Sequence, residues 1–151
     1  MMKKQILILL LSIVFTSLKA QTAEDSVKAI INQFFQGMKK ADTTLIRSTM
    51  TEGVIFQTIA RNKEGRMIVR SENVNDFLAF VAKQPKDAVD ERITFDMVRI
   101  DGNLASVWTP YKFYMNEKFI HCGANSFQLV KLDGTWRIQY LVDTRRKQGC
   151  E

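Results

Sequence analysis

The apolar residues of this chain change their spacing at Pro85, and this change limits the folds open to it. Before Pro85 they recur every three or four positions, as on one face of a helix. After Pro85 they alternate with polar residues, as in a strand with one buried face. Helices followed by strands are typical of an α+β fold in which the helices pack on one face of a sheet.

The first helix is predicted from an apolar stripe that runs for about five turns, and Thr22 or Asp25 can cap its start. The stripe consists of Val27, Ile30, Ile31, Phe34, Phe35 and Met38. A short second helix over 43–50 and a third helix that starts near Ser71 or Asn73 are also predicted. Two strands, over 54–59 and 67–70, separate these two helices.

Four β segments follow Pro85, over 92–100, 104–115, 118–132 and 136–143, and turns of two or three residues join them. Such short connections predict a mainly antiparallel sheet whose strands pair in order. Pro110 and Gly123 lie inside the long segments, where they favour a bend or a bulge. We therefore expect a strongly curved sheet that wraps around the first helix as a cone with a hollow end.

Residues 1–20 have the three-part pattern of a secretory signal. Lys3 and Lys4 precede an apolar stretch from Ile6 to Phe15, and Ala20 ends the segment. The stretch is shorter than the roughly 20 apolar residues that a membrane span needs. We expect export to the periplasm or beyond the cell and no membrane contact after cleavage, with a retained anchor as the alternative. The mature chain would consist of one domain, residues 21–144, and a tail, residues 145–151.

The basic character of the chain does not predict a nucleic-acid partner. Loss of Lys3, Lys4 and Lys19 with the signal removes three charges from the formal net charge of +6. Much of the remaining excess lies in 145–147, whereas nucleic-acid-binding proteins need a clustered basic face. We interpret this tail as a solvated C-terminal end, with a site for a polyanion as the alternative.

The two cysteines, Cys122 and Cys150, can form a disulfide if the chain reaches an oxidising compartment. Closing that loop would stabilise the fold by roughly 3 kcal/mol and would hold the tail in place. One histidine and two distant cysteines are a poor ligand set for zinc, so we expect no metal. The sequence has no motif that predicts a cofactor.

A family resemblance is carried mainly by the second half of the chain. Its residues are Trp108, Pro110, Tyr111, Phe113, Tyr114, His121 to Gly123, Phe127 to Lys131, Gly134, Trp136 to Ile138 and Asp143 to Arg146. Together with the order of helices and strands they resemble the nuclear transport factor 2-like superfamily, which includes ketosteroid isomerase-like and polyketide cyclase-like (SnoaL-like) proteins. Within it, the chain is similar to secreted bacterial members described as putative lumazine-binding. The resemblance implies a cone-shaped fold and a bound heterocycle, and it transfers no catalytic residue.

Strand parity predicts which residues line the hollow end. If the turn at Asp133–Gly134 closes symmetrically, Leu129 faces Ile138, and the same pairing can be extended across the other two turns. One face then combines aromatic rings with a few polar groups, as a small-ligand cavity requires. Its residues are Asp96, Trp108, His121, Asn125, Phe127 and Tyr140. A bulge at Gly123 would move His121 to the opposite face.

Asp96 and His121 are the candidate catalytic residues. Apolar neighbours would raise the pKa of the Asp96 carboxylate and let it move a proton near neutral pH. The alternative is an exposed Asp96 paired with a nearby Arg or Lys. His121 could act as a base or donate to a bound carbonyl group, with a structural role as the alternative.

The opposite face of the sheet would carry Phe95, Met97, Val107, Thr109, Tyr111 and Phe113. This face is too apolar to meet water over such an area. We expect a homodimer that pairs through it, as the resemblance also implies. The alternative cover is the C-terminal tail, tied down by Cys122 and Cys150.

Three functions follow from these expectations. The first is an exported module whose pocket binds a small apolar or aromatic molecule without transforming it. The second is a cofactor-independent isomerase, dehydratase or cyclase in which Asp96 is the base and His121, Asn125 or Tyr140 stabilises charge on a carbonyl oxygen. The third is a structural dimer with a filled core.

Overall fold

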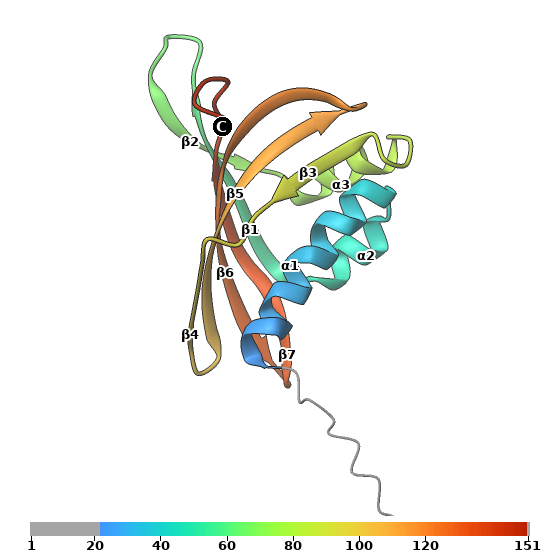
Figure 1. The fold of residues 1–151 in the computed structure, drawn as a ribbon, viewed down its shortest axis with the longest axis vertical. Coiled ribbons are helices and arrows are strands. Elements are labelled where there is room, and N and C mark those ends of the chain that lie inside the picture. The colour runs from blue at the N-terminus through green and yellow to red at the C-terminus, as the bar shows by residue number, and fades with distance from the viewer. Residues whose placement is uncertain (1–21, 151) are drawn as a thin grey trace, which may run out of the picture.

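The computed structural model describes residues 22–150, so the predicted signal segment lies outside the described residues. The predicted α+β class, with helices first and a curved sheet afterwards, is confirmed (Figure 1). In chain order the elements are α1 Ala23–Lys40, α2 Thr43–Ser48, β1 Met50–Arg61, β2 Met67–Glu72, α3 Val74–Ala82, β3 Val89–Ile93, β4 Met97–Asp101, β5 Leu104–Met115, β6 Lys118–Leu132 and β7 Thr135–Thr144. Between residues 22 and 150 no helix combines the length and the apolar character that crossing a bilayer requires.

Helix α1 forms the centre of the fold. Thr22 is its cap: the Thr22 side chain accepts a hydrogen bond from the Asp25 amide at 3.1 Å, and the Asp25 carboxylate accepts one from the Thr22 amide. The helix ends at Ala41, whose φ of 54° is left-handed. Val27, Ile31 and the other buried residues of the stripe pack inside the bend of the sheet.

The sheet has the strand order β2-β1-β7-β6-β5-β3, and β4 pairs with β5. All pairs are antiparallel except β1 and β7, which run parallel. Between them the chain passes through α3 to β3 at the opposite edge of the sheet and returns strand by strand to β7. Figure 1 shows α1, α2 and α3 gathered on one side of the strongly bent sheet. The space between helices and sheet is therefore enclosed on several sides.

The predicted first segment of the meander, residues 92–100, is two strands. β3 pairs with the second half of β5, where Val89 faces Met115, and β4 pairs with the first half, where Asp101 faces Leu104. Residues 94–96 connect them. The break allows the sheet to bend sharply beside α1, which a single continuous strand would resist.

Two one-residue irregularities change the register of the long strands. Tyr114 faces Phe119 but Phe113 faces His121, so Ile120 is an extra residue in β6. Gln128 faces Tyr140 but Leu129 faces Ile138, so Gln139 is an extra residue in β7. Because side chains alternate along a strand, one extra residue reverses the face of every position beyond it.

Because of the extra residue at Ile120, the residues of β5 that were predicted to form the dimer face point inward. Val107, Thr109 and Tyr111 are buried on the inner face, and Phe113 packs against the core. The outer face instead carries Trp108 and Tyr140, with a hydrogen-bonded Ser106–Gln128 pair between strands. Met97, opposite Trp108, is exposed on the outer face as predicted. Homodimerisation stays a prediction, and the β5 residues proposed for it are corrected.

The C-terminal segment continues from β7 along β6 and is held there. The structure contains the predicted disulfide between Cys122 and Cys150, with Cα atoms 5.7 Å apart. Cys122 and Arg146 also exchange two backbone hydrogen bonds. Gly123 is not a bulge, because it pairs with Tyr111 in regular register. A Cβ atom there would collide with the carbonyl of Thr144, so glycine permits the close approach of the two chain segments.

Candidate functional site

A cavity of about 430 Å³ lies between α1, α3 and the concave face of the sheet. This volume is in the range of small-molecule sites, roughly 300–1,000 Å³. Its apolar wall consists of Phe34, Phe35, Met38, Phe56, Phe77, Phe80, Val89, Phe113, Met115 and Leu141. Its polar residues are Gln57, Glu72, Asn73, Asp76, Glu91, Tyr111, His121, Asn125, Asp143 and Arg145. The exposed side chains of Asn73, Asp76 and Phe80 mark an open side.

The apolar wall is built from interlocked aromatic rings. Phe34 of α1 stacks on Phe77 of α3 with ring centroids 6.0 Å apart, and it meets Phe56 of β1 edge to face at 5.8 Å. Phe35 meets Phe127 edge to face at 6.0 Å. Contacts of this kind hold ring orientations, so the wall keeps its shape in the absence of a ligand.

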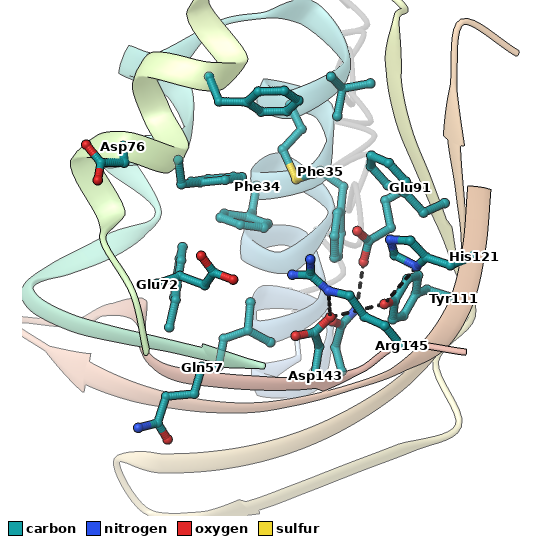
Figure 2. Close-up of a pocket in the computed structure, with 18 of the residues that line it drawn as sticks. Phe34, Phe35, Gln57, Glu72, Asp76, Glu91, Tyr111, His121, Asp143 and Arg145 are labelled. Atoms are coloured by element: carbon teal, nitrogen blue, oxygen red, sulfur yellow. Dashed lines mark hydrogen bonds and ion pairs between the residues drawn. The ribbon is translucent and has the colours of Figure 1, made fainter. Parts of the chain in front are cut away.

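Glu91 of β3 projects into the polar end of the cavity, as Figure 2 shows. Its Oε1 accepts a hydrogen bond of 2.8 Å from Asn125 Nδ2, and no other hydrogen bond reaches its carboxyl group from residues 22–150. Burial, and to a lesser degree the charge of Asp143, raises the pKa of Glu91 to about 7. This carboxyl group can therefore gain or lose a proton near neutral pH.

Asp143, at the end of β7, is the centre of a second polar group. Its Oδ2 accepts hydrogen bonds from Arg145 Nε at 2.8 Å and from the Tyr111 hydroxyl at 3.1 Å. The same hydroxyl is 2.9 Å from the carbonyl oxygen of Thr144. Burial raises the pKa of Tyr111 above its ordinary value, so the phenol keeps its proton.

His121 of β6 joins this group through its Nδ1 atom, which lies 3.3 Å from the Tyr111 hydroxyl. The imidazole stacks on Phe113 with ring centroids 5.0 Å apart. Burial, and then the charge of Arg145, lowers the pKa of His121. The ring is therefore neutral at pH about 7 and above, the form that can both donate and accept.

The structure brings together three of the six residues predicted to line the cavity. His121 and Asn125 face it directly. Phe127 lies on the same face, fully buried beneath the cavity wall against Phe34 and Phe35. The bulge that would have turned His121 away is at Ile120 rather than at Gly123, so it leaves His121 on the inner face.

The other three predicted residues lie outside the cavity. Asp96 is exposed in the connection between β3 and β4, because the predicted strand breaks there. Trp108 is on the outer face with 39% of its surface exposed, because the extra residue at Ile120 shifts its pairing from Asn125 to Ser126. Tyr140 is also outside and donates to Gln57 at 2.8 Å, because of the extra residue at Gln139.

Sequence reasoning missed Glu91, Tyr111, Asp143 and Arg145. Glu91 precedes the predicted start of its strand and lies between two charged residues, which indicated an exposed position. The predicted domain boundary at residue 144 separated Asp143 from Arg145, so the two residues were not considered as a pair. Their spacing of two residues in an extended segment was a usable signal, because it places both side chains on one face.

The described residues offer no metal site of their own. Within 22–150 no three His, Cys, Asp or Glu side chains are grouped so as to hold an ion. The cavity has hydrogen-bonding groups, among them the titratable Glu91, at one end and an aromatic wall at the other. Such an arrangement suits an organic molecule that is mostly apolar with one polar edge.

The chain is similar to known proteins in sequence and in fold. A family described as "Putative lumazine-binding" matches residues 22–140. No protein with curated annotation matches the chain.

Among solved structures, an NTF2-like protein of unknown function from Shewanella baltica OS155 is similar to the chain with a TM-score of 0.64 and 13% identity, over 83% of this chain and 94% of that one. An NTF2-like protein of unknown function from Methylobacillus flagellatus KT has a TM-score of 0.63 and 17% identity, over 86% and 98%. A protein of unknown function with a cystatin-like fold from Nostoc punctiforme PCC 73102 has a TM-score of 0.65 and 12% identity, over 84% and 95%. At these identities the structures show the shared fold, which confirms the nuclear transport factor 2-like resemblance.

Proposed function

The chain belongs to the family described as putative lumazine-binding, and from that membership and the cavity we propose that it binds a small, flat organic molecule between α1 and the sheet. The family description supports a heterocycle as the first class to test. The aromatic wall would cover the apolar body of the molecule, and Glu91, Asn125 and Arg145 would meet its polar edge.

One observation carries this proposal: a cavity of about 430 Å³ remains beside a half-buried carboxyl group whose pKa is raised by desolvation. Both features cost stability, since an interior packed with apolar side chains would lack the void and the desolvated acid. A chain selected only to fold and pair would lose nothing by filling the space. The presence of the cavity therefore disfavours a purely structural dimer with a filled core.

Native mass spectrometry of protein purified from its own host tests the proposal. We expect a retained small molecule that the variant Leu141→Trp fails to retain, because Leu141 lines the cavity and an indole would fill it. The matched control is Val142→Trp, the next residue of β7, whose side chain points outward. Fluorescence titration with lumazine tests the heterocycle class directly. A bare wild-type chain that also binds no lumazine would contradict the proposal.

A second function, proton transfer in an isomerase, dehydratase or cyclase, is favoured by the position of Glu91. The predicted base, Asp96, is exposed outside the cavity, so that assignment is wrong. Glu91 has the environment expected of a general base, because its pKa of about 7 lets it accept a proton at neutral pH and return it.

Deuterium exchange into an enolisable bicyclic ketone, 2-tetralone, tests this second function. A proton-transferring chain should exchange the α-protons faster than buffer does, and Glu91→Gln should lose that advantage. Exchange no faster with wild type than in buffer would contradict proton transfer, and equal acceleration by wild type and variant would exclude Glu91 as the base. Either result leaves the binding proposal intact.

Export is part of the same proposal. It is supported by the signal pattern in residues 1–20 and by the Cys122–Cys150 disulfide, since disulfides persist in oxidising compartments. Fractionation of the host should place the chain in the periplasm or the medium, with a mature N-terminus at Gln21. Recovery of the full-length chain from the cytoplasm would contradict export.

A further inference from the structure

We propose that the molecule held in the cavity carries a basic nitrogen, and that Glu91 binds this nitrogen as an ion pair at the polar end of the aromatic wall. This inference rests on the proposed binding function and names the chemical class of its ligand. It follows from three features of the cavity: a carboxyl group with a free oxygen, an excess of acidic groups, and an aromatic wall.

The first feature is the free bonding capacity of Glu91. Asn125 Nδ2 donates to Oε1 at 2.8 Å, and within residues 22–150 no group donates to Oε2. Figure 2 shows the carboxyl group directed into the cavity beside His121 and Arg145. A buried carboxylate needs a hydrogen-bonded counter-charge to remain ionised. A protonated amine supplies both the charge and the donors.

The second feature is the charge that faces the cavity from each element around it. Helix α1 contributes Phe34, Phe35 and Met38 and no charge, whereas β2 and α3 contribute Glu72 and Asp76. Beside Glu91 lie Asp143 and Arg145, with Tyr111 and a neutral His121.

Two of these acids have partners. Arg145 pairs with Asp143 at 2.8 Å, and Arg70 pairs with Glu72 at 2.7 Å. Glu91 and Asp76 have no salt-bridge partner among the described residues. The cavity therefore keeps an acidic excess, which attracts a cation and opposes an anion.

The third feature is the aromatic wall. A cation near the face of a ring is attracted by the ring quadrupole, by roughly 2 kcal/mol when both are desolvated. Phe34, Phe77 and Phe113 line the same cavity as Glu91. A ligand with an aromatic body and a charged amine can thus satisfy the wall and the carboxylate together, while a carboxylate ligand is repelled by both.

The charge of the ligand can be measured through the change in protonation of Glu91 on binding. Near pH 6.5 much of the carboxyl group is protonated, because its pKa is about 7. A bound cation favours the ionised form, so binding releases a proton into the buffer. A bound anion would favour the neutral form and take up a proton. A neutral ligand would change the protonation of Glu91 little, so few protons would be released or taken up.

Isothermal titration with three molecules of one shape tests the inference: 2-naphthylmethylamine, 2-naphthalenemethanol and 2-naphthoate. At pH about 7.5 we expect the ammonium form to bind at least about tenfold more tightly than the alcohol or the carboxylate. Repeating the titration near pH 6.5 in buffers of different ionisation enthalpy should show net proton release. Glu91→Gln should reduce the preference for the amine to less than about twofold and abolish the release.

The control variant is Asp76→Asn, which removes an acidic group at the open side of the cavity and should lower amine affinity by no more than about threefold. Circular dichroism checks that both variants fold. Equal binding of amine and alcohol, or tighter binding of naphthoate with proton uptake, would overturn the inference and leave the binding function standing. Failure of all three to bind at millimolar concentration would also overturn it, and native mass spectrometry would then decide the binding function by itself.

Discussion

The Tyr111 hydroxyl lies 3.3 Å from His121 Nδ1, and its other neighbours decide which of the two groups donates. A phenol has one proton, and the Tyr111 oxygen lies 2.9 Å from the carbonyl oxygen of Thr144 and 3.1 Å from Asp143 Oδ2. The carbonyl and the carboxylate oxygens can only accept. The neutral imidazole must therefore carry its proton on Nδ1, which leaves Nε2 as a hydrogen-bond acceptor.

Nitrogen-15 NMR should find neutral His121 in the Nδ1–H form, and the assignment is simple because the chain has one histidine. Tyr111→Phe removes the acceptor for that proton, so the share of the Nε2–H form should rise. The same variant should lose about 1–2 kcal/mol of stability with the bonds of the hydroxyl. A wild-type ring protonated at Nε2 would contradict the hydrogen-bond direction.

Glu91→Gln should make the fold less sensitive to pH. The pKa of Glu91 is about 7 in the folded chain against an ordinary 4.5, so the folded state keeps a proton that the unfolded state has lost. The contribution of this proton to stability is complete below the unfolded pKa and is lost as the pH rises through the folded pKa.

Chemical denaturation of wild type and Glu91→Gln from about pH 4.5 to 8 measures this effect. The difference between the two chains should move by roughly 3 kcal/mol in favour of the variant over that interval. Taking the difference cancels the titration of groups that both chains share. A difference that stays constant with pH would show that Glu91 titrates normally.

Gly123→Ala should destabilise the chain, because its Cβ atom would meet the backbone carbonyl of Thr144 rather than a side chain that can move. The expected loss is at least about 2 kcal/mol. Gly53→Ala is the matched control: it is a strand glycine of β1 with no atom within 4 Å of the added Cβ, so its effect should stay within about 0.5 kcal/mol. Similar urea midpoints for the two variants would contradict the close approach of Thr144 to Gly123.

Cys150→Ser should lower the free energy of unfolding by about 3 kcal/mol, because the disulfide to Cys122 closes a loop with a sequence separation of 28. Reduction of the wild-type chain should have the same effect. Alkylation without reductant should leave the wild-type mass unchanged. Two added alkyl groups would show that the thiols are free.

Local patterns were sufficient where a structural element depends on its own residues. The spacing from Val27 to Met38 predicted α1, and Asn73 was among the predicted caps of α3. The turn at Asp133–Gly134 predicted the first pairs of β6 and β7 correctly, up to Leu129 and Ile138. The same argument failed at the next residue, where Gln139 is inserted and Gln128 pairs with Tyr140.

The candidate site depended on longer-range contacts. Glu91 and Asn125 are 34 positions apart and meet because β5 lies between their strands. Tyr111 and Asp143 are 32 positions apart. They can meet only because Tyr111 is on the inner face of β5, whereas the predicted strand register had placed it on the outer face. No local sequence pattern predicts these two contacts, because each depends on how several strands pair at once.

The sequence alone determined the α+β class, the order of the elements and the possibility of a disulfide between Cys122 and Cys150, since these follow from periodicity, turn residues and the number of cysteines. Only the tertiary structure decided which side chains face the cavity. The strands must bend to pack around α1, and they accommodate the bend by inserting Ile120 and Gln139. Each insertion reverses the faces beyond it, which placed Tyr111 and Asp143 inside and left Trp108 and Tyr140 outside.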